Sequence, residues 1–229
     1  MVSIENSSKA PPEAQGEGAK YFLNFLKMID DPLPEMREYF DRENEYLTRL
    51  ITPASRVLDV GAGPARVMRV LGPKVQQIVG IERDPRMIAE GMRRLEDTPC
   101  NYKYLKGDLF DVEPARDFDL AFASYNFPGA DDIAPEQREG LLKHIVACVR
   151  PGGHAVVSFW KPTGEAWLKT YYEKAEATIK EIRGDVVETS VGIFTRFTDE
   201  DIQKLADTAG VPYSVVHLTP MFDLVDFHP

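Results

Sequence analysis

Apolar residues along this chain alternate between two patterns, short continuous runs and longer stretches with helical spacing. The longer stretches repeat apolar residues every three or four positions, which predicts helices over residues 85–95 and 135–149. Strands and helices that alternate in this way form a parallel sheet with helices on both faces. The pattern therefore predicts an α/β, doubly wound, mostly parallel sheet. The short runs that predict its buried strands are residues 57–60, 77–82, 102–109, 118–124 and 155–160.

Two further helical patterns precede the first predicted strand. The apolar side chains of residues 21–29 share one helical face, and the two prolines of residues 31–34 end that helix. Residues 36–51 then carry a second apolar stripe. Residues 1–16 show no apolar pattern, so we expect them to form a flexible tail.

The last third of the chain predicts a less regular arrangement. Apolar spacing predicts one long helix over residues 164–183, and residues 186–197 alternate enough for a short hairpin or an extended flap. Thr198 and Asp201 have the spacing of a capping box, which predicts the start of a helix that Gly210 ends. Closing strands are expected near residues 213–218 and 221–227.

Composition and charge narrow the range of functions. A chain of 229 residues with 43% apolar and 28% charged residues suits one globular domain. The net charge of −10 works against attraction to nucleic acid or to an anionic membrane. Two cysteines without a CxxC motif and four scattered histidines give no support for a disulfide framework or a metal site. No apolar run has membrane-spanning length and no signal-peptide core is visible, so we expect a cytoplasmic protein.

Residues 56–66, with the sequence Arg-Val-Leu-Asp-Val-Gly-Ala-Gly-Pro-Ala-Arg, predict a strand, a glycine loop and the start of a helix. Such a loop lets a ligand approach the main chain closely and presents amide groups to its polar atoms. Nicotinamide-binding domains also begin with Gly-x-Gly, but they need a third glycine where this chain has Arg66. A long side chain at that position would crowd a pyrophosphate, so a nicotinamide oxidoreductase is disfavoured.

The stretch instead resembles the first motif of the class I S-adenosylmethionine-dependent methyltransferases, in which an acidic residue such as Asp59 precedes the first glycine by two positions. Ala65 departs from the glycine that the family usually has there. The resemblance continues through residues 77–82, 102–109 and 118–124, and it ends with Val149-Arg150-Pro151-Gly152-Gly153, which is similar to the family's Leu-Lys-Pro-Gly-Gly turn. It covers roughly residues 56–160.

The resemblance implies S-adenosyl-L-methionine as the cofactor and a seven-stranded sheet with an N-terminal helical lid. Glu82, an acid at a strand end about twenty residues after the glycine loop, would accept the ribose hydroxyls. In the family the acid at Asp108 commonly meets the adenine amino group. The residues expected around the cofactor are Asp59, Gly61, Ala62, Gly63, Glu82, Arg83, Met87, Asp108, Leu109 and Ser124.

We expect the single domain to consist of several functional segments. Two lid helices within residues 17–52 precede the cofactor-binding core of residues 53–160. Residues 161–197 are an insertion or a second lid, and residues 198–229 supply the closing helix and strands.

Methyl transfer requires alignment of the acceptor, and a general base where the lone pair carries a proton. Tyr125, Asn126 and Tyr39 are the catalytic candidates, Lys161 is a further candidate base, and His217 is a less secure one. The segment 124–128 stands where amide-methylating and adenine-methylating relatives carry an Asn-Pro-Pro-Tyr type motif, and its lack of a double proline disfavours that chemistry. His154 begins a strand at the opposite end of the predicted sheet, which favours a structural role.

Clustered aromatic residues predict the class of acceptor. They could line a pocket for a flat or cationic small molecule. We therefore expect a methyltransferase that acts on a nitrogen or oxygen atom of a small molecule, as a monomer or homodimer. A protein or RNA methyltransferase, and a non-catalytic or repurposed cofactor-binding protein, remain as alternatives. The aromatic residues are Phe159, Trp160, Trp167, Tyr171 and Tyr172.

Overall fold

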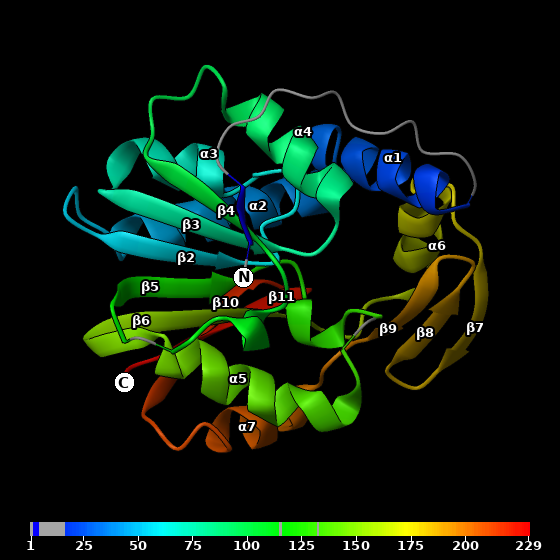
Figure 1. The fold of residues 1–229 in the computed structure, drawn as a ribbon. Coiled ribbons are helices and arrows are strands. Elements are labelled where there is room, and N and C mark those ends of the chain that lie inside the picture. Colours follow the sequence, from blue (N-terminus) through cyan, green and yellow to red (C-terminus); the bar gives the residue numbers. More distant parts are fainter. Residues whose placement is uncertain (1, 5–16, 115, 132) are drawn as a thin grey trace.

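The computed structural model describes residues 2–4, 17–114, 116–131 and 133–229, which form a large sheet, a small sheet and helices (Figure 1). In the large sheet β4, β3, β2, β5 and β6 are parallel, β11 runs antiparallel to β6, and β10 runs antiparallel to β11. The order across it is β1 (Val2–Ile4), β4 (Tyr102–Lys106), β3 (Gln77–Glu82), β2 (Arg56–Val60), β5 (Phe118–Ala123), β6 (Val149–Trp160), β11 (Phe222–Phe227) and β10 (Tyr213–Thr219).

The predicted seven-stranded, mostly parallel sheet is confirmed. It consists of β4, β3, β2, β5, β6, β11 and β10, and β1 adds a short eighth strand at its edge. The strand β2 occupies the centre, with β3 on one side and β5 on the other, so the strand order reverses there. Ligands of open α/β sheets bind at the carboxyl ends of the strands beside such a reversal. The topology therefore directs attention to the loops that follow β2, β3 and β5.

Helices cover both faces of the large sheet, as predicted (Figure 1). One face carries α2 (Pro34–Arg49), α3 (Met68–Leu71) and α4 (Pro85–Leu95). The other face carries α5 (Arg138–Ala147) and α7 (Asp199–Asp207). Two apolar clusters fill the layers: Leu58 packs in one and Val57 in the other, because successive side chains of a strand point to opposite faces.

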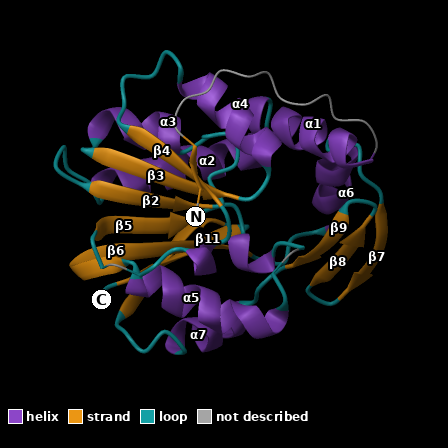
Figure 2. Cartoon of the chain, in the orientation of Figure 1, coloured by secondary structure: helices purple, strands orange, loops and turns teal. Residues whose placement is uncertain are grey.

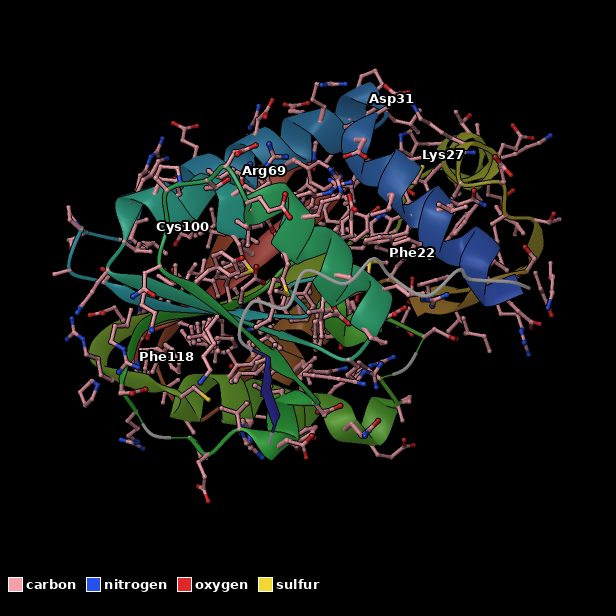
Figure 3. The ribbon with its side chains drawn as sticks, turned by 45° about the horizontal axis from the view of Figure 1, so that its top comes forward. Phe22, Lys27, Asp31, Arg69, Cys100 and Phe118 are labelled. Carbon is pink, nitrogen blue, oxygen red and sulfur yellow. The ribbon has the colours of Figure 1, made fainter. Side chains whose placement is uncertain are left out.

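Two further helices, α1 (Glu17–Asp30) and α6 (Glu165–Lys174), run near one another at one side of the large sheet (Figures 1 and 3). Ion pairs join the two segments: Lys27 to Glu176 at 2.5 Å and Lys174 to Asp31 at 2.7 Å. The small antiparallel sheet of β7 (Ile179–Arg183), β8 (Val186–Thr189) and β9 (Gly192–Thr195) stands apart from the large one, beside α6 (Figure 2).

Two expectations differ from the structure. The predicted helix over residues 164–183 ends at Lys174, because Glu176 has a left-handed φ of 52° and the alternating residues after it form β7. In addition, Val2–Ile4, expected within the tail, pair with β4 as β1. The rest of the expected tail, residues 5–16, lies outside the described residues.

The predicted starts of two helices and the predicted hairpin are confirmed. The helix α4 begins at Pro85 behind the cap Asp84, and α7 begins behind the capping box of Thr198 and Asp201. Residues 186–197 contain the predicted hairpin, β8 and β9. Within the described ranges, no helix is both long enough and apolar enough to cross a membrane.

The packing of α4 can be tested by comparing Gly91, in α4, with Gly140, in α5. A Cβ added at Gly91 would lie 2.0 Å from the hydroxyl oxygen of Tyr104, whereas one at Gly140 would meet Phe110 at 3.8 Å, an ordinary contact. We expect Gly91→Ala to lower the free energy of unfolding by about 1–3 kcal/mol through overpacking. The matched control Gly140→Ala should raise it by up to about 1 kcal/mol through helix propensity. Urea denaturation measures both, and equal effects of the two substitutions would contradict the packing.

Candidate active site

The loop after β2 turns at two glycines in left-handed conformation, Gly61 with φ 71° and Gly63 with φ 52°. A Cβ at Gly61 would lie 2.5 Å from the Phe127 ring, so the close approach of that ring also requires glycine. The Tyr104 hydroxyl donates a hydrogen bond of 3.0 Å to the carbonyl oxygen of Gly63. Ala65, where the family usually has glycine, is also left-handed, with φ 64°. For alanine this conformation costs roughly 1–2 kcal/mol, which explains the usual preference.

Glu82 ties this loop to the carboxyl end of β3. One carboxylate oxygen accepts a hydrogen bond of 2.9 Å from the Gly63 amide, and the other accepts 2.7 Å and 2.8 Å bonds from the amides of Arg83 and Asp84. On the neighbouring strand Asp108 accepts a bond from the Phe110 amide at 3.1 Å and lies 3.8 Å from the Arg83 guanidinium. The expected cofactor acids thus stand on adjacent strand ends.

Three other residues expected at the cofactor, Ala62, Met87 and Leu109, are buried around the same strand ends. Met87 belongs to the first turns of α4, and Leu109 begins the short helical turn that Asp108 caps. They could supply apolar surface to a planar group, and their assignment to the cofactor remains a prediction.

Asp59, near the end of β2, is only 3% exposed. Burial raises the pKa of its carboxyl well above the ordinary value, and the charges of Glu43 and Glu82 raise the pKa further, while Arg66 opposes the shift. Asp59 therefore lies near two other carboxyl groups and only one guanidinium. This excess of negative charge suits a positively charged ligand.

Glu43, on α2, forms the centre of a buried polar network that the sequence analysis missed. It is 1% exposed and accepts hydrogen bonds from Arg66 at 2.5 Å, from the Tyr39 hydroxyl at 2.5 Å and from the Ser124 hydroxyl at 2.7 Å. The guanidinium of Arg66 also lies 4.2 Å from the centre of the Phe40 ring. Its Nη1 is buried and has no hydrogen-bond partner among the described residues. A nitrogen in that state could bind a ligand carboxylate.

Tyr39 lies within the core, where its ring stacks on Phe222 with the ring centres 4.0 Å apart. Its hydroxyl accepts a 3.1 Å hydrogen bond from the Tyr125 amide while it donates to Glu43. Burial raises the pKa of the phenol, and the neighbouring Glu43 charge raises it further. These contacts are those of a residue that positions the Ser124–Tyr125 segment.

The segment after β5 holds two successive non-glycine residues in left-handed conformation, Tyr125 with φ 60° and Asn126 with φ 58°. Such strain persists only where surrounding contacts impose it. Asn126 supplies them: its side-chain oxygen accepts from the Trp160 amide, and its side-chain nitrogen donates to the Thr195 carbonyl, both at 2.9 Å. Its main-chain amide donates to the Ser158 hydroxyl at 2.8 Å. Because the amide group is fully used, its contacts favour a positioning role.

An aromatic cavity of about 160 Å³ opens beside this strained turn. Asn24 and Phe25 of α1 and Tyr171 and Tyr172 of α6 line it together with Trp160 at the end of β6. Tyr125 lines it too, and its hydroxyl is hydrogen-bonded to that of Tyr171. Among the clustered aromatics expected at a pocket, Trp160, Tyr171 and Tyr172 line the cavity, and Phe159 and Trp167 do not belong to its lining.

The two other base candidates, Lys161 and His217, form ion pairs away from the cavity. The amine of Lys161 pairs with Asp199 at 2.8 Å and with Asp223 at 3.2 Å. His217 is largely exposed, and its Nδ1 lies 2.9 Å from the Asp223 carboxylate. Neither residue lines the cavity.

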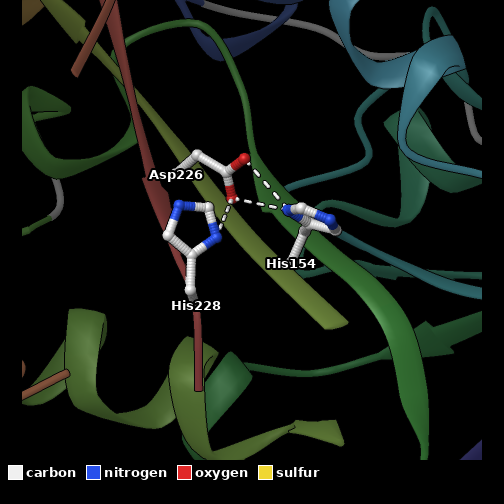
Figure 4. Close-up of side chains that lie close together, drawn as sticks. All are labelled: His154, Asp226 and His228. Carbon is white, nitrogen blue, oxygen red and sulfur yellow. Dashed lines mark hydrogen bonds and ion pairs between the residues drawn. The ribbon is translucent and has the colours of Figure 1, made fainter. Parts of the chain in front are cut away.

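His154 lies with Asp226 and His228 (Figure 4) at the end of the sheet opposite the glycine loop. The buried Asp226 carboxylate lies 3.0 Å from Nδ1 of His154 and accepts a 2.6 Å hydrogen bond from the Tyr46 hydroxyl. Nδ1 of His228 stands farther away, at 3.9 Å. The cluster joins α2, β6 and the end of β11, at the opposite end of the strands from the candidate active site.

Comparison with known proteins relates this geometry to a family and to solved structures. Residues 57–153 match the methyltransferase domain family. The chain is also 26% identical over 171 residues to the carboxy-S-adenosyl-L-methionine synthase of Shewanella piezotolerans, which covers 70% of this chain and 64% of that relative's length.

Two solved structures share the fold over nearly the whole chain. A methyltransferase from Clostridium acetobutylicum described as S-adenosylmethionine-dependent has 13% identity and a TM-score of 0.67, covering 92% of this chain and 98% of its own. An amino pentose methyltransferase from Micromonospora echinaspora has 16% identity and a TM-score of 0.63, covering 95% of this chain and 100% of its own. At this identity the likeness concerns the fold.

The buried network gives a stability prediction. We expect Arg66→Met to lower the free energy of unfolding by about 3–5 kcal/mol, because Glu43 is then left buried without a compensating charge. Adding Glu43→Gln to the same chain should recover most of that loss, since the remaining group is neutral. Urea denaturation of the two single variants and the double variant measures the coupling. Additive effects of the two substitutions would show that the pair does not act as a unit.

Proposed function

Because the chain belongs, through residues 57–153, to the class I S-adenosylmethionine-dependent methyltransferases, we propose that it methylates a nitrogen or oxygen atom of a small-molecule acceptor. The junction at Ser124 and Tyr125 carries the proposal. Ser124 bonds the charged network around Glu43, while the next residue, Tyr125, lines the aromatic cavity. Two successive residues thus join a region suited to a cation with a region suited to an apolar acceptor.

The residues around the glycine loop fit S-adenosylmethionine. Glu82 accepts three amide bonds and retains a lone pair for a ribose hydroxyl. The buried Asp59 suits the ammonium group of the amino-acid end, and the unpartnered Nη1 of Arg66 suits its carboxylate. We assign Asp108 to the adenine amino group, as the family resemblance implies.

S-adenosylmethionine supplies a methyl group on a positively charged sulfur: the acceptor's lone pair forms the new bond, the carbon–sulfur pair stays on sulfur, and the acceptor loses a proton. The protein aligns the acceptor and excludes water, and alignment of this kind can supply roughly 7–11 kcal/mol. We propose that Tyr125 contacts the acceptor, while Tyr39 and Asn126 position the segment that carries it.

The enclosed shape of the cavity and the net charge of −10 support a small molecule over an RNA or protein acceptor. The amino pentose methyltransferase among the structural relatives acts on such a molecule. Mass spectrometry of a small-molecule panel incubated with S-adenosylmethionine tests the proposal. Formation of S-adenosylhomocysteine together with a methylated acceptor supports it, and no turnover with any small molecule would contradict it.

One observation favours a second candidate, in which the sulfonium compound itself is modified. The curated relative is named a carboxy-S-adenosyl-L-methionine synthase. In that reaction a carboxylic acid co-substrate would give up its carboxyl group as CO2 to the S-methyl carbon, and the proton lost from that carbon would replace the carboxyl group on the co-substrate. Mass spectra recorded with carboxylic acids in the panel separate the two candidates, because this reaction would yield a sulfonium compound heavier by CO2 and no S-adenosylhomocysteine.

The ribose assignment gives a binding prediction. We expect Glu82→Gln to weaken S-adenosylmethionine binding by more than about tenfold, because a charged acceptor of hydrogen bonds becomes a weaker neutral one. Isothermal titration calorimetry measures the change. Glu113→Gln, the same substitution at an exposed carboxylate, is the matched control and should leave the affinity nearly unchanged. Unaltered affinity in Glu82→Gln would exclude the ribose contact.

The raised pKa of Asp59 predicts opposite effects on stability and binding. The unfolded chain has an ordinary carboxyl pKa of about 3.9, so the folded state is increasingly disfavoured as pH rises from that value through the raised pKa. Asp59→Asn should therefore stabilise the cofactor-free protein, and more at pH 8 than at pH 4. It should also weaken S-adenosylmethionine binding. Urea denaturation at both pH values and calorimetry measure the two effects, and a variant destabilised at pH 8 would refute the assignment.

A further inference from the structure

Three metal-ligating side chains lie together at the end of the large sheet opposite the glycine loop (Figure 4). We propose that His154, Asp226 and His228 bind a zinc ion, with a water molecule as the fourth ligand. This site is separate from the proposed function, because none of its residues is assigned to the cofactor or to the acceptor. No metal-binding motif marks it in the sequence, since its ligands are separated along the chain.

The pairing of β6 with β11 explains why the three side chains meet. The two strands are antiparallel, and Ala155 lies opposite Phe227. The next positions outward are His154 and His228, which therefore stand opposite each other on the same face of the sheet. Asp226 is two residues before His228 and shares that face. The rings of the two histidines lie 5.5 Å apart, edge to face.

The ligand atoms are close enough for one ion to reach all of them. One such atom from each residue lies within 4.8 Å of the other two. Nδ1 of His154 lies 3.0 Å from Oδ2 of Asp226, and Nδ1 of His228 lies 3.9 Å from Oδ1 of the same carboxylate. Two ligand atoms of a tetrahedral zinc ion stand about 3.3 Å apart. Because the side chain of His228 is 40% exposed, a small rotation of its ring would complete the site.

The set of donor atoms suits zinc better than magnesium or calcium. Sites of two histidines and one carboxylate hold zinc and leave its fourth position open to water. Magnesium and calcium prefer oxygen ligands throughout. The carboxylate of Asp226 is buried and supplies a negative charge, while both imidazoles are partly exposed. An ion can therefore enter from solvent and keep a water molecule on that side.

Neighbouring side chains hold two of the ligands in the orientation that binding requires. The Tyr46 hydroxyl donates a hydrogen bond of 2.6 Å to Oδ2 of Asp226. Nε2 of His228 lies 3.4 Å from the Ser214 hydroxyl oxygen, and Nδ1 of the same ring is turned toward the carboxylate. Ligating carboxylates and histidines in metal sites usually have hydrogen-bond partners of this kind.

The main chain after β11 is held from both sides. The amide of His228 donates a hydrogen bond of 2.8 Å to the carbonyl oxygen of Pro212, just before β10. On the other side the amide of Gly152, in β6, donates a bond of 2.9 Å to the carbonyl oxygen of Pro229. The segment that carries the third ligand is therefore already ordered, and binding an ion requires little further loss of chain entropy.

A second histidine of this chain shows what an ordinary histidine–aspartate pair looks like. Nδ1 of His217 lies 2.9 Å from the buried carboxylate of Asp223, and the amine of Lys161 lies 3.2 Å from that carboxylate. Among the described residues this pair belongs to no group of three metal ligands. Because it lacks a third ligand, it provides the control for the proposed site.

Titration calorimetry of zinc chloride into the full chain, after EDTA treatment and removal of the chelator, tests the site. We expect one ion per chain with a Kd below about 10 μM, and no measurable binding of magnesium chloride. Free zinc at a hundred times Kd should raise the melting temperature by about 5–10 °C. Absence of zinc binding, an unchanged melting temperature, or equal affinity for magnesium would overturn the proposal.

His228→Ala gives the matching variant, and its partly exposed position should let the chain fold, which circular dichroism checks. We expect it to weaken zinc binding by more than about tenfold. Tyr46→Phe, which removes only the hydroxyl that orients the carboxylate, should weaken binding by about tenfold. The control His217→Ala should leave the affinity unchanged. Unaltered affinity in His228→Ala, or an equal loss in His217→Ala, would place the zinc elsewhere and overturn the proposal.

Discussion

The buried carboxylate of Glu43 is the contact on which the arrangement of the candidate site depends. It joins α2 to the glycine loop through Arg66 and to the end of β5 through Ser124, and Tyr39 extends the link to the amide of Tyr125. A buried ion pair of this kind adds little net stability compared with apolar packing, but the loss of one partner is costly. Its value here is geometric, because three separate segments keep one relative position.

The same contact separates two environments that a methyltransferase needs close together. On one side lies the acid-rich edge formed by Asp59, Glu82 and Asp108, and on the other lies an uncharged aromatic cavity. The Ser124–Tyr125 segment, held in a strained turn by Asn126, connects them. A charged donor and an apolar acceptor can therefore approach the same point without sharing a solvent-filled cleft.

Local signals explain which parts of the fold could be predicted. The strand and loop of residues 56–66 and the boundaries of α4 depend on neighbouring residues such as Asp84 and Pro85, so the sequence shows them directly. The end of α6 depends on the unfavourable backbone of Glu176 and on pairing with β8, which helical spacing does not reveal. The Glu43–Arg66 pair joins residues 23 positions apart. Its available signal was a carboxylate within the apolar stripe of Met36, Phe40 and Leu47, which apolar counting overlooks.

Ion pairs at the surface join α1 to the rest of the molecule. Its ion pairs reach Glu176 and, from the residues at its end, Arg94 and Lys174, and each has at least one largely solvated partner. Pairs of this kind contribute about 0–1 kcal/mol each and weaken with salt. The prolines at positions 32 and 34 limit bending to the short segment that follows the helix. Ionic strength should therefore loosen the attachment of α1 while it leaves the buried Glu43–Arg66 pair nearly unaffected, because water and salt screen exposed charges far more than buried ones.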